Sequence, residues 1–113
     1  GDSAVSGDVE TAIGRIVGST ERVGGDNRYE TSQKIALKFF PGAHDSIVLA
    51  SGDNFPDGLV GGPLGLNARG PLLLVNGRNT DLASGYAAGA GATTCFILGG
   101  EKVISSSTVQ KIM

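Results

Sequence analysis

Three short apolar runs constrain the fold of this chain more than any other feature. They occupy residues 47–50, 72–75 and 95–98, and each run stops at small or polar residues. Their apolar residues are consecutive rather than alternating, which is typical of strands buried on both faces of a sheet. A helix-length segment separates each run from the next. This alternation predicts an α/β fold, a three-layer α/β/α sandwich of Rossmann-like or Toprim-like type with a mainly parallel sheet.

The remaining segments supply the other predicted elements. Residues 20–23 are predicted as a first, short strand, which brings the sheet to about four strands. Asn27 is a good N-cap with Glu30 as its capping-box partner, so a helix is expected over residues 28–40, before Pro41. Further helices are predicted at residues 57–68, at 81–89 and from Ser105 onward.

The chain of 113 residues is expected to form one domain over residues 20–113. Residues 1–19 are small and polar, and they are predicted as a leader or linker. Val5, Val9 and Ile13 are spaced by four, which is compatible with one or two helical turns. Whether this segment is ordered stays open at this stage.

Charge and composition exclude several function classes. The net charge is −2 and the charges are scattered, so the electrostatic footprint of a nucleic-acid binder is missing. No segment approaches the roughly 20 apolar residues of a transmembrane helix, and no membrane insertion is expected. The single cysteine, Cys95, lies inside an apolar run and is interpreted as a small buried hydrophobe.

Right-handed crossovers place all strand-to-helix loops at one edge of a parallel sheet. Three cations, Arg28, Arg78 and Lys102, fall in these loops and could hold phosphate, pyruvyl or uronate groups of an acidic glycan. Salt bridges to acidic residues of the same loops are an equally weighted alternative. Tyr29 and Phe55 could stack on sugar faces, although Phe55, just before Pro56, could simply plug the loop into the core.

Catalytic and cofactor chemistry find little support. Gly99 and Gly100 form only a weak candidate phosphate cradle without a nucleotide-binding motif. Asp53 and Asp57 could act as an acid–base pair or half a metal site, but Asp57 precedes a helix and is better explained as its cap. His44 is the only histidine and lies at a turn. No metal, cofactor or catalytic residue is therefore predicted.

Several ordered motifs carry a family resemblance. They are Arg22-Val23-x-Gly25-x-x-Arg28-Tyr29-x-Thr31, Val48-Leu49-Ala50-Ser51-Gly52-x-x-Phe55-Pro56-Asp57, Pro63-Leu64, Pro71-Leu72-Leu73-Leu74, and Ile97-Leu98-Gly99-Gly100 with Val103-x-Ser105. In this order and spacing, residues 21–113 resemble one module of the cell wall-binding repeat 2 family of Gram-positive surface proteins, S-layer proteins and wall hydrolases.

The resemblance implies a secreted, non-catalytic anchor at the cell surface that binds an anionic secondary cell-wall polymer. Members typically carry three modules in a pseudo-threefold trimer, so this single module implies a homotrimer or sister modules in a longer chain. The Pro-Ile-Leu-Leu segment implicated in polymer binding matches at Pro71, Leu73 and Leu74, with Leu72 replacing Ile. A larger departure is residues 58–62, where glycines replace the usual alanines.

Together these arguments predict two sets of residues. The polymer-binding set is Arg28, Tyr29, Asn54, Phe55, Leu72, Leu73, Leu74, Asn76, Arg78 and Lys102. The structural loop and cap set is Gly25, Asn27, Ser51, Gly52, Asp57, Gly99, Gly100 and Ser105. Two alternatives remain: a peptidoglycan-directed hydrolase or amidase, and an assembly module that builds the trimer without binding a ligand.

Overall fold

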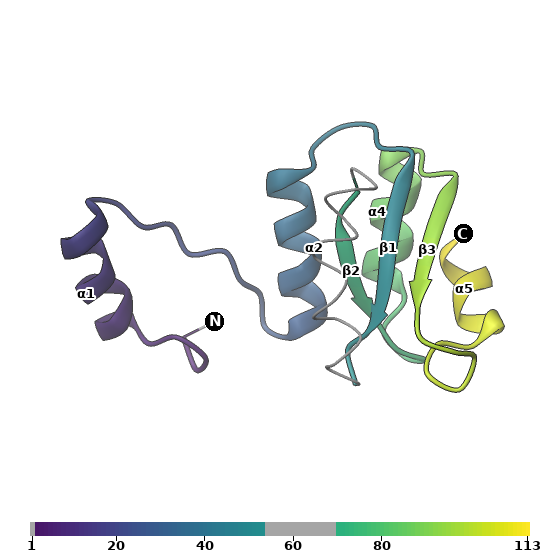
Figure 1. Ribbon diagram of the computed structural model, residues 1–113, viewed down its shortest axis with the longest axis horizontal. Helices are drawn as coiled ribbons and strands as arrows, with labels where there is room; N and C mark the ends of the chain where they lie inside the picture. Colours follow the sequence, from purple (N-terminus) through teal and green to yellow (C-terminus); the bar gives the residue numbers. More distant parts are fainter. Residues whose placement is uncertain (1, 54–69) are drawn as a thin grey trace.

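The computed structural model describes residues 2–53 and 70–113 of the chain (Figure 1). Its elements, in order, are α1 (Gly7–Val17), α2 (Arg28–Phe39), β1 (Ser46–Ser51), β2 (Leu72–Val75), α4 (Asp81–Ala90), β3 (Thr94–Leu98) and α5 (Ser106–Ile112). The three strands predicted from apolar runs are confirmed, as are the predicted helices at α2, α4 and α5. The helix predicted at residues 57–68 lies outside the described residues.

The three described strands form a parallel sheet in the order β2-β1-β3. β1 is central, and its Ala50 is level with Leu74 of β2 and with Leu98 of β3. The mixed α/β class and the parallel sheet are therefore confirmed, while the fourth strand is not. The strand predicted at residues 20–23 is wrong, because this segment runs as a linker beside which none of the described strands lies to supply ladder hydrogen bonds.

One face of the sheet packs against helices. α2 and α4 cover this face, and α5 packs beside α4. The core between them is small and is formed by apolar side chains from the sheet and the helices: Ala36, Ile47, Leu49, Leu73, Val75, Ala83, Tyr86, Ala87, Ala90, Ile104 and Ile112. Alanines on the helices let the backbones approach the sheet closely. Full burial of each large aliphatic side chain contributes roughly 1.5–3 kcal/mol.

The central and edge strands differ in burial. Val48 and Ala50 of β1, which alternate with the core residues, are also fully buried, so β1 is covered on both faces as its apolar run predicts. β3 does not follow this prediction, since Phe96 and Ile97 are each 40% exposed. Among the strands that the structure describes, only β1 lies beside β3. The second helical layer of the predicted sandwich was assigned to residues 57–68, outside the described part.

Helix α1 stands apart from the sheet and its helices (Figure 1). It begins at the N-cap Ser6 and has no buried residue. The linker holds it through Arg22, whose Nε lies 2.6 Å from Oε1 of Glu10 and 3.2 Å from Oδ1 of Asp2. The segment predicted as a leader or linker thus contains a helix that packs on no other helix or strand of the described chain.

Two backbone details position the start of β2. A Cβ atom at Gly70 would lie 2.1 Å from the carbonyl oxygen of Ser46, so only glycine lets the chain pass this close to β1. Farther along, the amide of Leu74 donates to the hydroxyl of Ser32 on α2 at 3.0 Å. Ser32 thereby pairs a backbone group of an edge strand and ties α2 to the sheet.

Candidate ligand-binding site at the carboxyl edge of the sheet

The loops after β1 and β2 meet beside the first turn of α2. The amide of Gly52, just after β1, donates to the carbonyl oxygen of Val75 at the end of β2 at 2.9 Å. Asn27 caps α2 by accepting from the amide of Glu30 at 2.9 Å, which aims Arg28 and Tyr29 at the two loops. In open parallel sheets, this carboxyl edge is the usual place for a ligand site.

Tyr29 is the centre of a polar cluster that joins three segments. Its hydroxyl lies 3.1 Å from Oδ1 of Asp53 and accepts from Nδ2 of Asn76 at 2.7 Å. The same Nδ2 lies 3.2 Å from Oδ1 of Asp53. Burial, followed by the hydrogen bond and the negative charge of Asp53, raises the pKa of Tyr29 above its usual value. The phenol therefore stays protonated at neutral pH and donates to the carboxylate.

Gly52 lies directly against the Tyr29 ring. A Cβ atom at Gly52 would approach Cε1 of Tyr29 to 2.4 Å, closer than any real side chain allows. The carbonyl oxygen of Gly52 accepts a hydrogen bond from Arg28 at 2.5 Å. Arg28 therefore already has a backbone partner and helps hold the loop. The side chain of Ser51 accepts from the amide of Asp53 at 3.0 Å, which completes the turn.

Asn76 shapes the second loop. Its Oδ1 accepts from the amides of Arg78 and Asn79, at 2.9 and 2.8 Å, and from Nδ2 of Asn79 at 2.9 Å. This Asx-type turn satisfies backbone donors without a strand or helix. Both ends of the Asn76 side-chain amide thus contribute. Nδ2 contacts the Tyr29 cluster, and Oδ1 fixes the direction in which Arg78 and Asn79 project.

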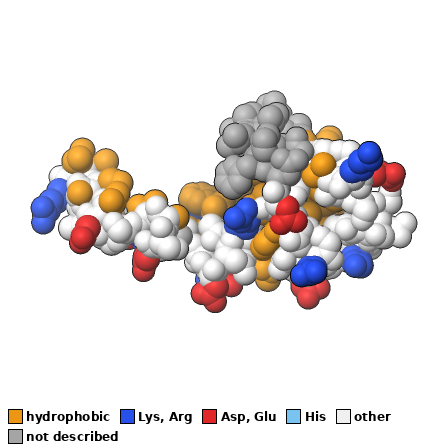
Figure 2. All heavy atoms as spheres, turned by 90° about the horizontal axis from the view of Figure 1, so that it is seen from below, with side chains coloured by type: hydrophobic (Ala, Val, Ile, Leu, Met, Phe, Trp, Pro, Cys, Tyr) orange, Lys and Arg blue, Asp and Glu red, His pale blue; other side chains and the backbone are white. Residues whose placement is uncertain are grey.

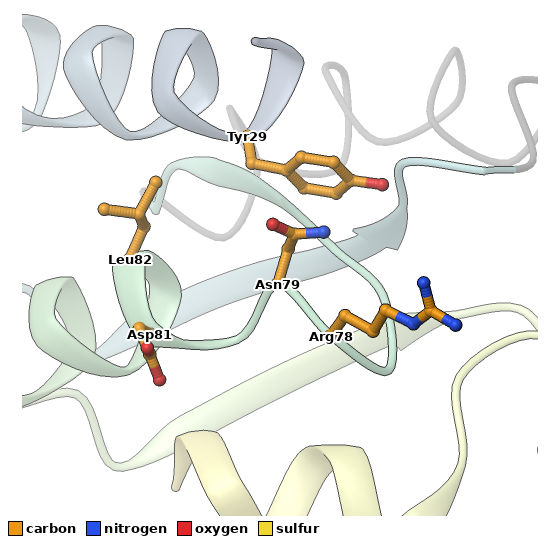
Figure 3. A pocket seen from close by; sticks show the side chains of 5 residues that line it. All are labelled: Tyr29, Arg78, Asn79, Asp81 and Leu82. Carbon is orange, nitrogen blue, oxygen red and sulfur yellow. The ribbon is translucent and has the colours of Figure 1, made fainter. Parts of the chain in front are cut away.

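A pocket of about 250 Å³ opens next to this cluster, lined by Tyr29, Arg78, Asn79, Asp81 and Leu82. Figure 3 shows Tyr29 of α2 on one side and the loop with Asn79 facing it, while Leu82 and Arg78 lie at opposite ends. The Arg78 side chain extends outward. In the part of the chain that the structure describes, Arg78 takes part in none of the ion pairs.

The predicted polymer-binding residues separate into distinct environments. Tyr29 and Arg78 line the pocket, and Asn76 and Arg28 support it. Leu73 is 1% exposed and belongs to the core, so its side chain is not available to a polymer. Leu72 and Leu74 alternate with it and are half-buried. Lys102 is exposed in the turn after β3. Asn54 and Phe55 lie outside the described residues.

The predicted structural residues also differ from one another. Asn27 and Ser105 accept N-cap hydrogen bonds, the latter from Thr108 at 3.2 Å. Gly99 has a φ of 110°, a conformation that favours glycine. Gly25 lies against Glu30, where a Cβ atom would be 2.5 Å from Cγ, whereas Gly100 has open space around it. Asp57 lies outside the described part.

Asn79, Asp81 and Leu82 line the pocket but were missing from the predicted set. The sequence predicts Asp81 only as the first residue of a helix. The available signal was the spacing of Asn76 and Asn79 after a strand, since an Asx turn presents the residues inside it on one side. Leu82 could not be assigned in this way, because which face of α4 meets the loop depends on tertiary packing.

The described residues contain no group of three or more His, Cys, Asp or Glu side chains able to hold a metal ion. The imidazole of His44 lies 3.2 Å from the carbonyl oxygen of Pro41, away from the carboxyl edge. None of the helices within residues 2–53 and 70–113 has the length and apolar character needed to cross a membrane.

Residues 22–109 match the family model of cell wall binding domain 2. The chain belongs to the cell wall binding domain 2 family. The match covers both loops of the candidate site and every described residue that lines the pocket. The family described from the sequence motifs is therefore confirmed.

The cell wall binding domain 2 fold is also seen in a solved structure. Cwp8 from Clostridium difficile superimposes with a TM-score of 0.72 and 24% sequence identity, covering 99% of this chain and 18% of that one. Two uncharacterized proteins, from Pyrococcus horikoshii and Pyrococcus abyssi, are 33% and 32% identical over 72 and 73 residues. These segments cover 64% and 65% of this chain, and the chain spans about a fifth of the length of each relative, 22% in both cases.

Proposed function

We propose that this module anchors a larger secreted protein to the cell wall by binding an anionic secondary wall glycopolymer, without catalysis. Membership of a cell wall binding family supports the wall as target. The candidate site supplies the chemistry for a charged glycan at the carboxyl edge of the sheet. Arg78 is the principal cation, and Arg28 and Lys102 are auxiliary ones.

The observation that carries this proposal is the position of Arg78. Its guanidinium extends from a pocket that also presents an aromatic ring and the Asn79 side chain (Figure 3). An aromatic ring stacks on sugar faces, an amide bonds to hydroxyls, and a guanidinium binds a carboxylate, phosphate or pyruvyl group through two parallel hydrogen bonds. Within residues 2–53 and 70–113, Arg78 has no ion-pair carboxylate that a ligand would have to displace.

The half-buried side chains of Leu72 and Leu74 extend the proposed contact. They lie on the sheet face opposite the helical core, because Leu73 between them points into that core. The apolar faces of sugar rings could pack there, at the strand that leads into Asn76. Leu73 contributes only by fixing the strand.

Sedimentation with purified cell walls tests the charge-dependent part. Arg78→Ala is expected to weaken binding by about tenfold, equivalent to roughly 1.4 kcal/mol, and Arg78→Lys by less, because a point charge remains but the bidentate fork is lost. Lys111→Ala, an equal charge change at an exposed position of α5, is the control. Walls stripped of secondary polymer by acid extraction should lose binding. Full binding by Arg78→Ala at both low and high salt would refute the electrostatic proposal.

An assay for released muropeptides tests the absence of catalysis. The expected result is no release by the purified module at concentrations that saturate wall binding. Release that depends on Asp53, the carboxylate in the Tyr29 cluster, would favour the hydrolase alternative instead.

Exposed apolar residues on β3 favour association with sister modules or two further copies as an additional role. Phe96 and Ile97 are each 40% exposed on an edge strand. Light scattering of the isolated chain should show a trimer that Phe96→Asp dissociates. A monomer at high concentration would contradict homotrimerisation, whereas a trimer that binds no wall fraction would favour the assembly alternative.

A further inference from the structure

The segment before the module repeats the end of the module. Residues 2–13 align without gaps on residues 101–112, each counterpart lying 99 positions later in the sequence. Ser6 corresponds to Ser105 and Ile13 to Ile112, and both pairs are identical. Asp2 corresponds to Glu101, Val5 to Ile104, and Val9 to Thr108, all of similar charge or shape.

The two segments also have the same local structure. Each consists of a three-residue turn, a bend, a capping serine and a helix. The backbone angles of Ser6 are φ −68° and ψ 161°, and those of Ser105 are φ −74° and ψ 156°. Each serine accepts from the amide three residues later, Val9 at 3.3 Å and Thr108 at 3.2 Å. The likeness therefore extends from sequence to dihedral angles and capping.

The two segments differ sharply in what covers them. In α5 and its leading bend, Ile104, Thr108 and Ile112 are 4%, 5% and 5% exposed, because they pack into the core beside α4. Their counterparts Val5, Val9 and Ile13 are 45%, 48% and 42% exposed. Figure 2 shows hydrophobic side chains gathered on one side of the outlying segment. The same apolar stripe is therefore buried in the core at α5 and exposed at α1.

We propose that residues 2–17 are the closing turn and helix of a second copy of this module, and that Val5, Val9 and Ile13 pack against the α4 helix of that copy. The occupant of the stripe is therefore another cell wall binding domain 2 module, placed before this one. The corresponding place on this module is already filled by α5. This inference rests on the internal repeat and is independent of the proposed polymer binding.

The ion pairs of Arg22 fit this assignment. Its guanidinium group bonds to Glu10 and to the carbonyl oxygen of Ser6, at 2.6 and 3.3 Å. Neither contact uses a side chain of the apolar stripe. Arg22 therefore joins the linker to α1 while leaving Val5, Val9 and Ile13 free for the preceding module. Docking of α1 would then also fix the angle between the two modules.

A duplicated chain tests the proposal directly. A second copy of residues 18–99 is fused ahead of the full chain, so that residues 1–17 can complete it, and amide hydrogen exchange is followed by mass spectrometry. Amides of α1 should exchange at least tenfold more slowly than in the single full chain. Ile13→Asp should abolish this protection, whereas Thr11→Asp, on the side of α1 away from the stripe, should keep it. Equal exchange of α1 in the fusion and the single chain would count against the proposal.

A graft within one module covers the case in which the added copy fails to fold. Residues 101–113 of the full chain are replaced by a second copy of residues 2–14. If α1 is a true equivalent of α5, the graft should unfold cooperatively, with a midpoint within a few degrees of the parent. The same graft with Ile13→Asp should unfold at a markedly lower temperature. Loss of cooperative unfolding in the unmutated graft, matching a chain truncated after Gly100, would overturn the proposal.

Discussion

Gly52 and the ring of Tyr29 are in contact so close that no side chain larger than hydrogen fits between them, since a Cβ atom would lie 2.4 Å from the ring. This contact holds the loop after β1 against the first turn of α2. The Tyr29 hydroxyl then reaches Asp53 and Asn76 in the two loops. The geometry of the candidate site therefore depends on a backbone position that carries no chemistry of its own.

Gly52→Ala is expected to destabilise the fold by about 1–3 kcal/mol, the usual range for a forced extra methyl group. It should also weaken wall binding more than the stability loss explains, because Tyr29 must move out of the pocket wall. Urea denaturation and wall sedimentation measure the two effects. Gly77→Ala is the matched control, since nothing lies within 4 Å of its added Cβ atom. Equal stability of the two variants would refute the close-contact argument.

Ser32→Ala should cost about 1–3 kcal/mol of stability, because it removes the hydroxyl to which the Leu74 amide of an edge strand donates. The loss should appear in hydrogen exchange as faster opening of β2 than of β1. Ser84→Ala in α4 serves as the control, with an expected change near zero or slightly stabilising, as alanine is the better helix former. Unchanged exchange of the Leu74 amide would show that α2 does not hold this strand through Ser32.

Asn76→Ala is expected to lose both functions of the side chain, the turn and the contact with Tyr29. Asn76→Asp keeps an oxygen for the amides of Arg78 and Asn79 but places a second carboxylate beside Asp53. We expect the alanine variant to bind walls several-fold more weakly through disorder of Arg78. The aspartate variant should raise the pKa of Tyr29 further, measurable by ultraviolet titration of the phenol, and an unchanged titration would contradict the cluster.

Burial raises the pKa of Cys95 from 9.0 to about 11. The unfolded thiol ionises first, so the stabilising effect of the neutral, half-buried thiol is complete below pH 9 and is lost as pH rises towards 11. Stability should therefore fall over this window, and by less in Cys95→Ala than in the parent chain. Alkylation by iodoacetamide at pH 8 should be slow in the folded protein and fast in urea. Equal pH slopes for the two proteins would exclude Cys95 as the source.

The strand positions could be predicted because consecutive apolar residues between helix-length segments have few other solutions. Central and edge strands could not be told apart. Val48 and Phe96 sit in runs of similar hydropathy, yet Val48 is fully buried and Phe96 is 40% exposed, because strand order is decided by tertiary packing. The strand prediction at residues 20–23 is wrong for the same reason, because a run of β-favouring residues becomes a strand only where a partner strand lies beside it.

The candidate site was predictable to the level of loops. The rule for parallel sheets brings Asn76 and Arg78 to one edge, and the structure places them beside Tyr29 there, although the strand expected before Tyr29 does not form. Whether a side chain can contact a ligand or only supports the loops depends on the direction in which that side chain points. Arg28 points at the carbonyl oxygen of Gly52, and Leu73 points into the core. The period-two alternation of a strand would have separated Leu73 from its neighbours, whereas the family motif treats all three leucines as one unit.

Gly70 fixes the register of β2 and, through it, the position of the candidate site. A side chain there would meet the backbone carbonyl of Ser46, which cannot rotate away as a side chain could. Relief by a one-residue slip of β2 would turn Leu73 and Val75 away from the helices and shift the Asn76 turn by about 3.3 Å along the strand. The close contact between Gly70 and Ser46, at the start of β2, thus sets how far Arg78 projects beyond the end of the strand. A substitution at Gly70 can therefore weaken ligand binding even when every residue that lines the pocket is unchanged.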